Sequence, residues 1–245
     1  MPDRRLPLVL LPGTMCDARV FAPLLDRLPP CQVLVPSLVG HETPADMAQT
    51  LLAELPQRFV LGGFSLGGIV ALEMAAQAPQ RIAGLALFDT TARPDPEGNA
   101  TLRRNAVARA AQLGTGRYAG QKLWSLYVSP EAGDLETHRA LVSAMAADAG
   151  IEAFRQQSEM AIARADSRPR LARIAMPTLV LCGEDDRLCS VDAHRELAAG
   201  ISGARLAVLP QAGHFALIER PDAVATEVAA WLARIDGQKP RKEPP

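Results

Sequence analysis

The sequence predicts an α/β fold, a doubly wound and mostly parallel sheet of about six strands with an inserted all-helical cap. Two observations lead to this prediction. Short apolar runs alternate with helical patterns along most of the chain, and one long connection carries helical patterns but no strand-like run. A chain of 245 residues is long enough for one catalytic domain with an insertion.

The strand candidates are short runs that are mostly apolar rather than alternating. Continuous apolar runs are typical of parallel strands that helices cover on both faces. The first run follows Arg4 and Arg5 and resembles part of a signal peptide, but it is too short and Pro12-Gly13 interrupts it, so a buried strand is the better interpretation. The predicted strands are Leu6–Leu11, Cys31–Val35, Phe59–Leu61, Ile82–Phe88, Thr178–Cys182 and Leu206–Leu209.

Helical patterns separate these strands, as right-handed crossovers in a parallel sheet require. Pro221 stands where proline is favoured, in the first turn of a helix. The helices predicted in the core are Asp17–Leu28, Ala45–Leu55, Leu66–Ala78, Asp192–Ala199 and Asp222–Arg234.

The connection from Asp89 to Pro177 is far longer than the roughly 2–6 residues of an ordinary loop. Its helical patterns predict an inserted cap. We expect Trp124, Tyr118 and Tyr127 to pack this cap onto the core, the alternative being direct contact with the substrate. The predicted cap helices are Ala100–Leu113, Arg117–Val128, Leu135–Ala147 and Ile151–Arg164. The predicted division is a core at 1–91 and 169–237, a cap at 92–168 and a disordered tail at 238–245.

Composition and charge exclude several classes of function. The formal net charge of −1 gives no indication of a nucleic-acid or membrane partner, and no apolar run approaches the roughly 18–20 residues that span a bilayer. The lack of an export signal predicts a cytoplasmic location.

The four cysteines have no metal-ligand spacing, and we expect them to be free thiols, although Cys182 and Cys189 are close enough in sequence for a bridge. The sequence gives no indication of the oligomeric state.

The sharpest chemical signal is the segment Gly63-Phe64-Ser65-Leu66-Gly67, which follows a predicted strand and opens a predicted helix. A sharp turn between strand and helix strains the backbone of the serine and projects its hydroxyl above the sheet. Side chains at 63 and 67 would collide in so tight a turn. Ser65 is therefore the candidate nucleophile, the alternative being a glycine-rich helix start with Ser65 as a simple N-cap.

A serine nucleophile needs an adjacent base, and His214 is the best placed of the four histidines. It follows the last predicted strand and should lie at the same edge of the sheet as Ser65. His41 also follows a strand but precedes Ser65 in the chain, and we interpret it as structural. His138 and His194 lie on helical patterns among charged residues, and we expect both to be solvated.

The acid that orients the base should follow another strand, and two segments supply candidates. One is Glu184-Asp185-Asp186, after the fifth predicted strand, and the other is Asp89, after the fourth. Asp89 remains a competitor because its strand ends at the same edge, although it could equally be a turn-capping residue.

Four segments together resemble the α/β-hydrolase superfamily, in particular its capped branch of small carboxylesterases, perhydrolases, enol-lactonases and carbon–carbon bond hydrolases. They are Leu10–Thr14, Gly63–Gly68, Gly183–Asp186 and Ala212–His214. The resemblance covers nearly the whole chain and implies a triad of Ser65, Asp186 and His214, in the order found in this superfamily.

The resemblance also implies an oxyanion hole formed by the backbone N–H groups of Thr14 and Leu66. The chain departs from the family in having Pro12 where histidine is usual and Cys189 where proline is common. We expect only the backbone geometry of the first loop to be needed.

The function expected on these grounds is acyl-enzyme hydrolysis of a small ester-like substrate, with no metal or organic cofactor. Carbon–carbon bond hydrolysis, lactone opening, thioester cleavage and perhydrolysis are alternatives on the same triad. A non-catalytic binding protein that kept the fold is a further alternative from a different class.

Overall fold

The centre of the molecule is a six-stranded sheet with the order β2-β1-β3-β4-β5-β6, in which every neighbouring pair is parallel. The computed structural model describes residues 6–237. The predicted fold class, with its mostly parallel sheet, is confirmed. The strands are β1 (Leu8–Leu11), β2 (Val33–Leu34), β3 (Phe59–Phe64), β4 (Ile82–Phe88), β5 (Thr178–Gly183) and β6 (Arg205–Leu209).

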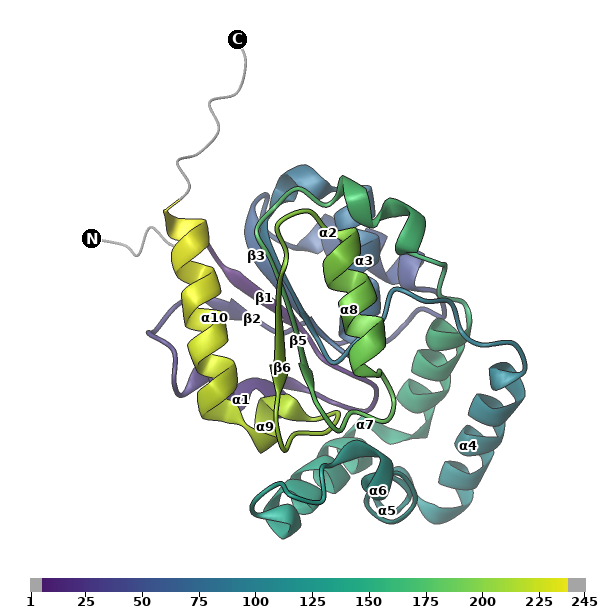
Figure 1. The fold of residues 1–245 in the computed structure, drawn as a ribbon. Helices are drawn as coiled ribbons and strands as arrows, with labels where there is room; N and C mark the ends of the chain where they lie inside the picture. The colour runs from purple at the N-terminus through teal and green to yellow at the C-terminus, as the bar shows by residue number, and fades with distance from the viewer. Residues whose placement is uncertain (1–5, 238–245) are drawn as a thin grey trace.

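Helices cover both faces of the sheet, which explains why the central strands are apolar throughout. In β1, Leu8 and Leu10 belong to one core cluster, whereas Val9 and Leu11 belong to the other, because successive side chains point to opposite faces. Figure 1 shows α1 and α10 on one side of the sheet and α2, α3 and α8 on the other. These helices are α1 (Ala22–Leu25), α2 (Pro44–Glu54), α3 (Leu66–Gln77), α8 (Val191–Gly200) and α10 (Pro221–Asp236).

Local signals set the starts of several core helices. The Thr43 side chain accepts the backbone N–H of Asp46 at the start of α2, and Ser190 caps α8 in the same way. Pro221 is the first residue of α10, where its missing N–H costs nothing. These caps place the helix starts within a residue of the positions expected from the sequence.

The connection between β4 and β5, which we call the cap, forms a layer of helices, drawn in teal in Figure 1, beside the end of the sheet where α9 lies. Its longest helix, α7, runs through both of the segments that the sequence predicts as separate helices, with a kink at Gly150, whose φ is +75°. The helices are α4 (Asn99–Leu113), α5 (Thr115–Tyr118), α6 (Trp124–Tyr127) and α7 (Leu135–Ile162), with a π-helical turn at Ala119–Leu123.

Short elements differ most from the sequence-based expectation. The predicted helix at Asp17–Leu28 is a 3-10 turn at Ala18–Phe21 followed by the single turn of α1. The four-residue helix α9 (Ala216–Glu219) was not predicted, because so short a segment carries no periodic signal. Further 3-10 turns occur at Pro79–Arg81 and Arg168–Arg173. The predicted disordered tail, 238–245, lies outside the described residues.

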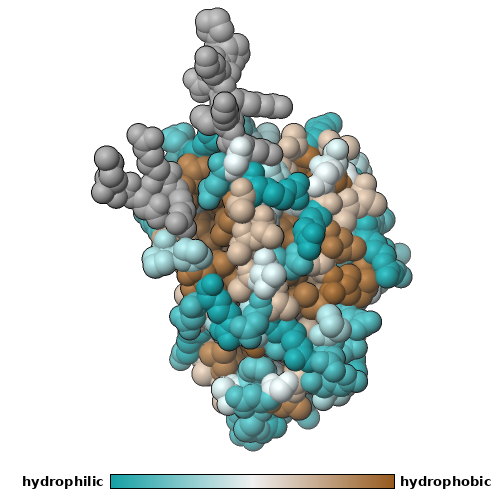
Figure 2. Space-filling model, turned by 60° about the vertical axis from the view of Figure 1, so that its left-hand side comes forward, coloured by the Kyte–Doolittle hydropathy of each residue, from teal (hydrophilic) through white to brown (hydrophobic). Residues whose placement is uncertain are grey.

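The surface mixes polar and apolar residues. Figure 2 shows one face on which brown hydrophobic areas are interspersed with teal hydrophilic ones. The more exposed large hydrophobic side chains lie apart in the sequence, among them Val39, Leu102, Leu188 and Val208. None of the helices within residues 6–237 is both long and apolar enough to span a membrane.

Candidate active site

Ser65 occupies a sharp turn between β3 and α3. Phe64 is the last residue of β3 and Leu66 the first of α3, and Ser65 between them has φ 51° and ψ −114°. A non-glycine residue rarely adopts a positive φ, and its presence marks local strain that surrounding contacts must maintain. The Ser65 N–H donates to the carbonyl of Phe88 at 2.9 Å, and its own carbonyl accepts the Thr90 hydroxyl at 2.7 Å.

The two glycines of the motif are required by close backbone approaches. A Cβ at position 63 would lie 2.4 Å from the carbonyl oxygen of Gly67. A Cβ at position 67 would lie 2.1 Å from the carbonyl oxygen of Leu11. Real Cβ atoms do not come this close to backbone oxygen, so the turn and its packing against β1 depend on glycine at both positions.

His214, in the loop after β6, reaches the hydroxyl of Ser65. Its Nε2 lies 2.9 Å from Ser65 Oγ, and its Nδ1 lies 2.9 Å from Oδ2 of Asp186. The carboxylate can only accept, so Nδ1 carries the proton and Nε2 is free to accept the serine O–H. The ring is almost fully buried and lies against Phe64, Tyr127 and Phe215.

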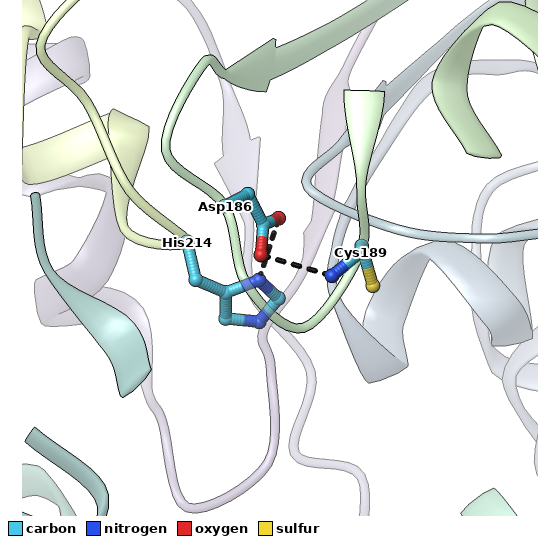
Figure 3. Close-up of side chains that lie close together, drawn as sticks. All are labelled: Asp186, Cys189 and His214. Atoms are coloured by element: carbon cyan, nitrogen blue, oxygen red, sulfur yellow. Dashed lines mark hydrogen bonds and ion pairs between the residues drawn. The ribbon is translucent and has the colours of Figure 1, made fainter. Parts of the chain in front are cut away.

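Asp186 follows β5 and is held by the turn that it begins. Its Oδ1 accepts the backbone N–H groups of Leu188 at 2.8 Å and Cys189 at 2.9 Å, while Oδ2 is left for His214. Figure 3 shows the carboxylate between the imidazole and the Cys189 N–H. Burial alone would raise the pKa of Asp186, but the neighbouring His214 and these hydrogen bonds outweigh burial and hold the pKa below its usual value.

Asp89, the competing acid in the sequence, is also buried at this edge but does not bond to the imidazole. Its Oδ1 accepts the N–H of Gly183 at 3.0 Å, and its Oδ2 is buried without a hydrogen-bonding partner among the described residues. Burial and the negative charge of Asp186 raise the pKa of Asp89 well above its usual value. A carboxyl group in this environment favours its neutral form.

The other histidines have different surroundings from those expected. The prediction that His194 is solvated is wrong, because its side chain is buried. Its Nε2 accepts the Thr90 N–H at 2.9 Å and its Nδ1 lies 3.0 Å from the carbonyl of Ser190, so it supports the strand end that carries Asp89. His138 is half-buried, not fully solvated. His41 lies 2.9 Å from the hydroxyl of Thr50 and does not line the cavity that contains Ser65.

Glu219 is a buried carboxylate at the site that the sequence reasoning missed. It lies in α9, and it accepts the backbone N–H groups of Gly213 at 2.9 Å and Phe215 at 3.1 Å, the two residues that flank His214. It also accepts the N–H of Ser129 in the cap at 2.9 Å. The N–H of His214 itself donates to the carbonyl of Tyr127 at 2.7 Å. Glu219 therefore ties the histidine loop to the cap.

The two residues expected to supply an oxyanion hole lie beside Ser65. Leu66 is the first residue of α3, where backbone N–H groups have no partner within the helix, and Thr14 lines the same cavity as Ser65. The loop that carries Thr14 is anchored from the cap, because Gln157 in α7 accepts the N–H of Met15 at 2.8 Å and donates to the carbonyl of Leu38 at 3.2 Å. Gln157 is a second buried polar residue that the sequence pattern did not reveal.

A cavity of about 360 Å³ opens above Ser65 and His214, between the sheet and the cap. Aromatic and aliphatic side chains form much of its wall, and the cap helices contribute Leu123, Tyr127 and Phe154. Tyr127, expected to pack the cap on the core, lines the cavity and lies over the His214 ring, with 6.0 Å between ring centres. The cavity is large enough for a small organic substrate.

Asp186, Cys189 and His214 each offer an atom that could bind a metal ion, and these three atoms lie within 4.8 Å of one another. The imidazole and carboxylate already bond to each other, and burial raises the pKa of the Cys189 thiol, which disfavours the thiolate that binds metals. The arrangement fits proton transfer better than metal binding. Cys182 and Cys189 are not joined to each other and remain thiols, as expected.

Comparison with known proteins agrees with this geometry. Residues 8–227 match the model of the alpha/beta hydrolase family. A pimeloyl-[acyl-carrier protein] methyl ester esterase of Aromatoleum aromaticum is 31% identical, with 88% of this chain and 93% of that protein covered.

Two solved structures are also similar. One is a thermophilic esterase from Thermogutta terrifontis, with a TM-score of 0.84, 27% identity and coverage of 94% of this chain and 90% of that one. The other is the enol-lactonase from Burkholderia xenovorans, with a TM-score of 0.83, 25% identity and coverage of 94% and 92%.

Proposed function

The chain belongs to the alpha/beta hydrolase family, and from that premise we propose that Ser65, His214 and Asp186 are the catalytic triad of this ester-cleaving serine hydrolase. The observation that carries the proposal is the unbroken chain of hydrogen bonds from hydroxyl to imidazole to carboxylate, with 2.9 Å at each step. Similar proteins of Aromatoleum aromaticum and Neisseria meningitidis are named as methyl ester esterases.

The proposed reaction has two acyl-transfer steps. Ser65 Oγ attacks the ester carbonyl while Nε2 of His214 takes its proton, and Asp186 stabilises the imidazolium that forms. The backbone N–H groups of Leu66 and Thr14 hold the oxyanion, and removal of one such donor typically costs about 10²–10³ in rate. The imidazolium then gives its proton to the leaving alkoxide, which departs as the alcohol. A water deprotonated by His214 releases the acid from the acyl-enzyme and restores Ser65.

The cavity above Ser65 supports a small substrate, and the relatives suggest which ester. The similar esterase of Aromatoleum aromaticum is named for a methyl ester, so we propose a small alkyl ester of a carboxylic acid. Lactone opening is the principal alternative, because an enol-lactonase has a similar structure. Thioester cleavage, carbon–carbon bond hydrolysis and perhydrolysis use the same triad and stay as further alternatives.

Two proposals concern organisation and location. We propose residues 92–168 as the cap that shapes the substrate cavity, with 1–91 and 169–237 as the core, because α4 to α7 all fall within the cap range. We propose the cytoplasm as the location, because the free thiols of Cys182 and Cys189 fit a reducing compartment.

The test is turnover of a panel of short methyl and p-nitrophenyl esters, with lactones, thioesters and β-diketones alongside. Ser65→Ala should abolish turnover of every substrate that the wild-type protein hydrolyses. Ser202→Ala changes an exposed serine between α8 and β6, and this control should retain full activity. If Ser65→Ala were as active as the wild-type protein, Ser65 could not be the nucleophile.

A further inference from the structure

The cavity above Ser65 has an uneven distribution of charge. Its charged lining residues, all within the described part of the chain, are three arginines, Arg103, Arg164 and Arg187, together with the titratable His214, and no aspartate or glutamate lines it. Much of the rest of the wall is apolar, with side chains such as Leu123, Phe154 and Phe215. A substrate that fills this space meets both an apolar surface and a cationic one.

One buried carboxylate holds two of the arginines in place. Asp95 accepts Nε and Nη2 of Arg103, each at 2.9 Å, and Nη1 of Arg164 at 2.9 Å. The side chains of Asp95 and Arg164 are only 6% and 8% exposed. Burial alone would raise the pKa of Asp95, but the two arginines outweigh burial and hold the pKa below its usual value, so the carboxylate is charged.

The charges in this cluster do not balance. Arg164 also donates to backbone carbonyls, from Nε to Arg93 at 2.9 Å and from Nη1 to Ala161 at 2.9 Å. Asp95 therefore neutralises one of the two guanidinium groups, and the cluster keeps a net charge of about +1. The Nη1 group of Arg103 makes no hydrogen bond to any residue within 6–237. The Arg103 side chain lines the cavity and is 33% exposed.

A third cation lies near the triad. Arg187 directly follows Asp186 and lines the cavity, and its Nη1 donates to the carbonyl of Ser125 at 3.0 Å. No acidic side chain is paired with Arg187 among the described residues. Positive charge that protein groups leave unbalanced, in a partly enclosed site, favours an anionic ligand.

From these contacts we propose that Arg103, positioned by Asp95 and Arg164, binds a carboxylate group of the substrate, so that the enzyme prefers the half-ester of a dicarboxylic acid to a neutral ester. The planar fork of a guanidinium matches the two oxygens of a carboxylate. The apolar wall accommodates the methylene chain between the carboxylate and the ester. This inference rests on the proposed function, because it assumes that the ester carbonyl is placed at Ser65.

The experiment compares each monomethyl ester of the linear C5 to C8 dicarboxylic acids with its own dimethyl ester. The two members of a pair have the same chain and differ in the charge at the far end. The readout is the ratio of the two kcat/KM values, which cancels any loss of folded enzyme in a variant. We expect the monomethyl ester to be favoured by about 10-fold or more at one chain length at least, as for a charge-assisted hydrogen bond.

Two variants separate recognition from simple support of the cap. Arg103→Gln should lower the ratio by about 10-fold. A purely structural role for Arg103 would leave the ratio unchanged in this variant. Arg104→Gln is the matched control, because Arg104 is the neighbouring residue on α4, pairs with Glu159 and does not line the cavity. Its ratio should equal that of the wild type.

A calorimetric titration separates this inference from the proposed function. Ser65→Ala should bind the favoured monomethyl ester more tightly than its dimethyl ester, without turnover. If the wild type hydrolyses dimethyl esters but never favours the monomethyl ester, the carboxylate site is refuted and the esterase stands. If Ser65→Ala binds the monomethyl ester preferentially and the wild type hydrolyses neither, the carboxylate site stands and the proposed function fails.

Discussion

Oδ1 of Asp89 accepts the backbone N–H of Gly183, the last residue of the neighbouring strand β5, at 3.0 Å. Asp186, three residues beyond Gly183, directs its carboxylate to His214 instead, at 2.9 Å. Two buried aspartates at adjacent strand ends are thus divided in role. One closes the strand end and favours its neutral form, while the other faces the imidazole as an anion.

This difference predicts unequal effects when each aspartate is replaced by asparagine. Asp186→Asn should lower kcat by about 10³-fold or more, because an amide cannot stabilise the imidazolium or hold the required tautomer. Asp89→Asn should lower kcat by less than about 10-fold, since its backbone contact can be kept by the amide oxygen. Steady-state kinetics on one p-nitrophenyl ester checks both, and a greater loss from the Asp89 change would reverse the assignment of the acid.

The raised pKa of Asp89 predicts a particular dependence of stability on pH. A carboxyl whose pKa is higher in the folded state than its unfolded value of about 3.9 binds its proton more tightly when folded, so its contribution to stability is lost as pH rises through the folded pKa. Asp89→Asn removes this loss. The free energy of unfolding of Asp89→Asn relative to wild type should therefore increase as pH rises above the unfolded pKa of about 3.9.

Urea titrations at a series of pH values measure that difference. Ser202→Ala, which changes an exposed hydroxyl, should show a constant difference from wild type over the same range. A difference for Asp89→Asn that stays flat or falls with pH would mean that the aspartate is not held in its neutral form.

Glu219 should act as a positioning residue for His214. Glu219→Gln keeps the size of the side chain but turns an N–H₂ group towards the backbone N–H groups that flank the histidine. We expect kcat per active site to fall by about 10-fold with KM nearly unchanged, and the protein to lose roughly 1–3 kcal/mol of stability. Active sites are counted by titration with a fluorophosphonate.

The control for that variant is Glu136→Gln, which alters an exposed glutamate at the start of α7. It should match the wild type in kcat, KM and stability. If Glu219→Gln loses stability but keeps the wild-type kcat per titrated site, Glu219 supports the fold alone and does not position the base.

Gln157 anchors the loop that carries Thr14, and a substitution at this residue tests the anchor. Gln157→Leu removes the acceptor of the Met15 N–H and frees the loop that carries Thr14. We expect kcat to fall by about 10-fold or more, because an oxyanion donor must be held in place before the reaction. The affinity for a neutral competitive inhibitor, measured alongside, should change much less than kcat. An unchanged kcat would show that the loop does not need this anchor.

Much of the fold could be predicted from the sequence because its signals are local. The apolar run of β4 and the cap residues of α2 and α8 mark their own boundaries. Gly63 and Gly67 likewise predict the sharp turn at Ser65. Single turns such as α9 could not be found, because four residues carry no period.

The buried polar residues that support the site were beyond sequence reasoning for a different reason. Glu219, Gln157 and His194 have partners that are distant in the chain or in another layer of the fold. Nothing in their neighbours distinguishes such residues from solvated ones on a helix, which is why the sequence predicts a solvated His194. Arg103 and Asp95 are close in the chain, but Arg164 joins them only because the end of the connection between β4 and β5 folds back beside its start.

The most direct test of the proposed triad is mass-spectrometric mapping of the protein after reaction with a fluorophosphonate. The proposed chemistry predicts one modified peptide with the adduct on Ser65, and at least 100-fold slower labelling in His214→Ala, since the serine then lacks its base. Wild-type protein that is folded and yet unlabelled at Ser65, or labelled equally fast without His214, would contradict it.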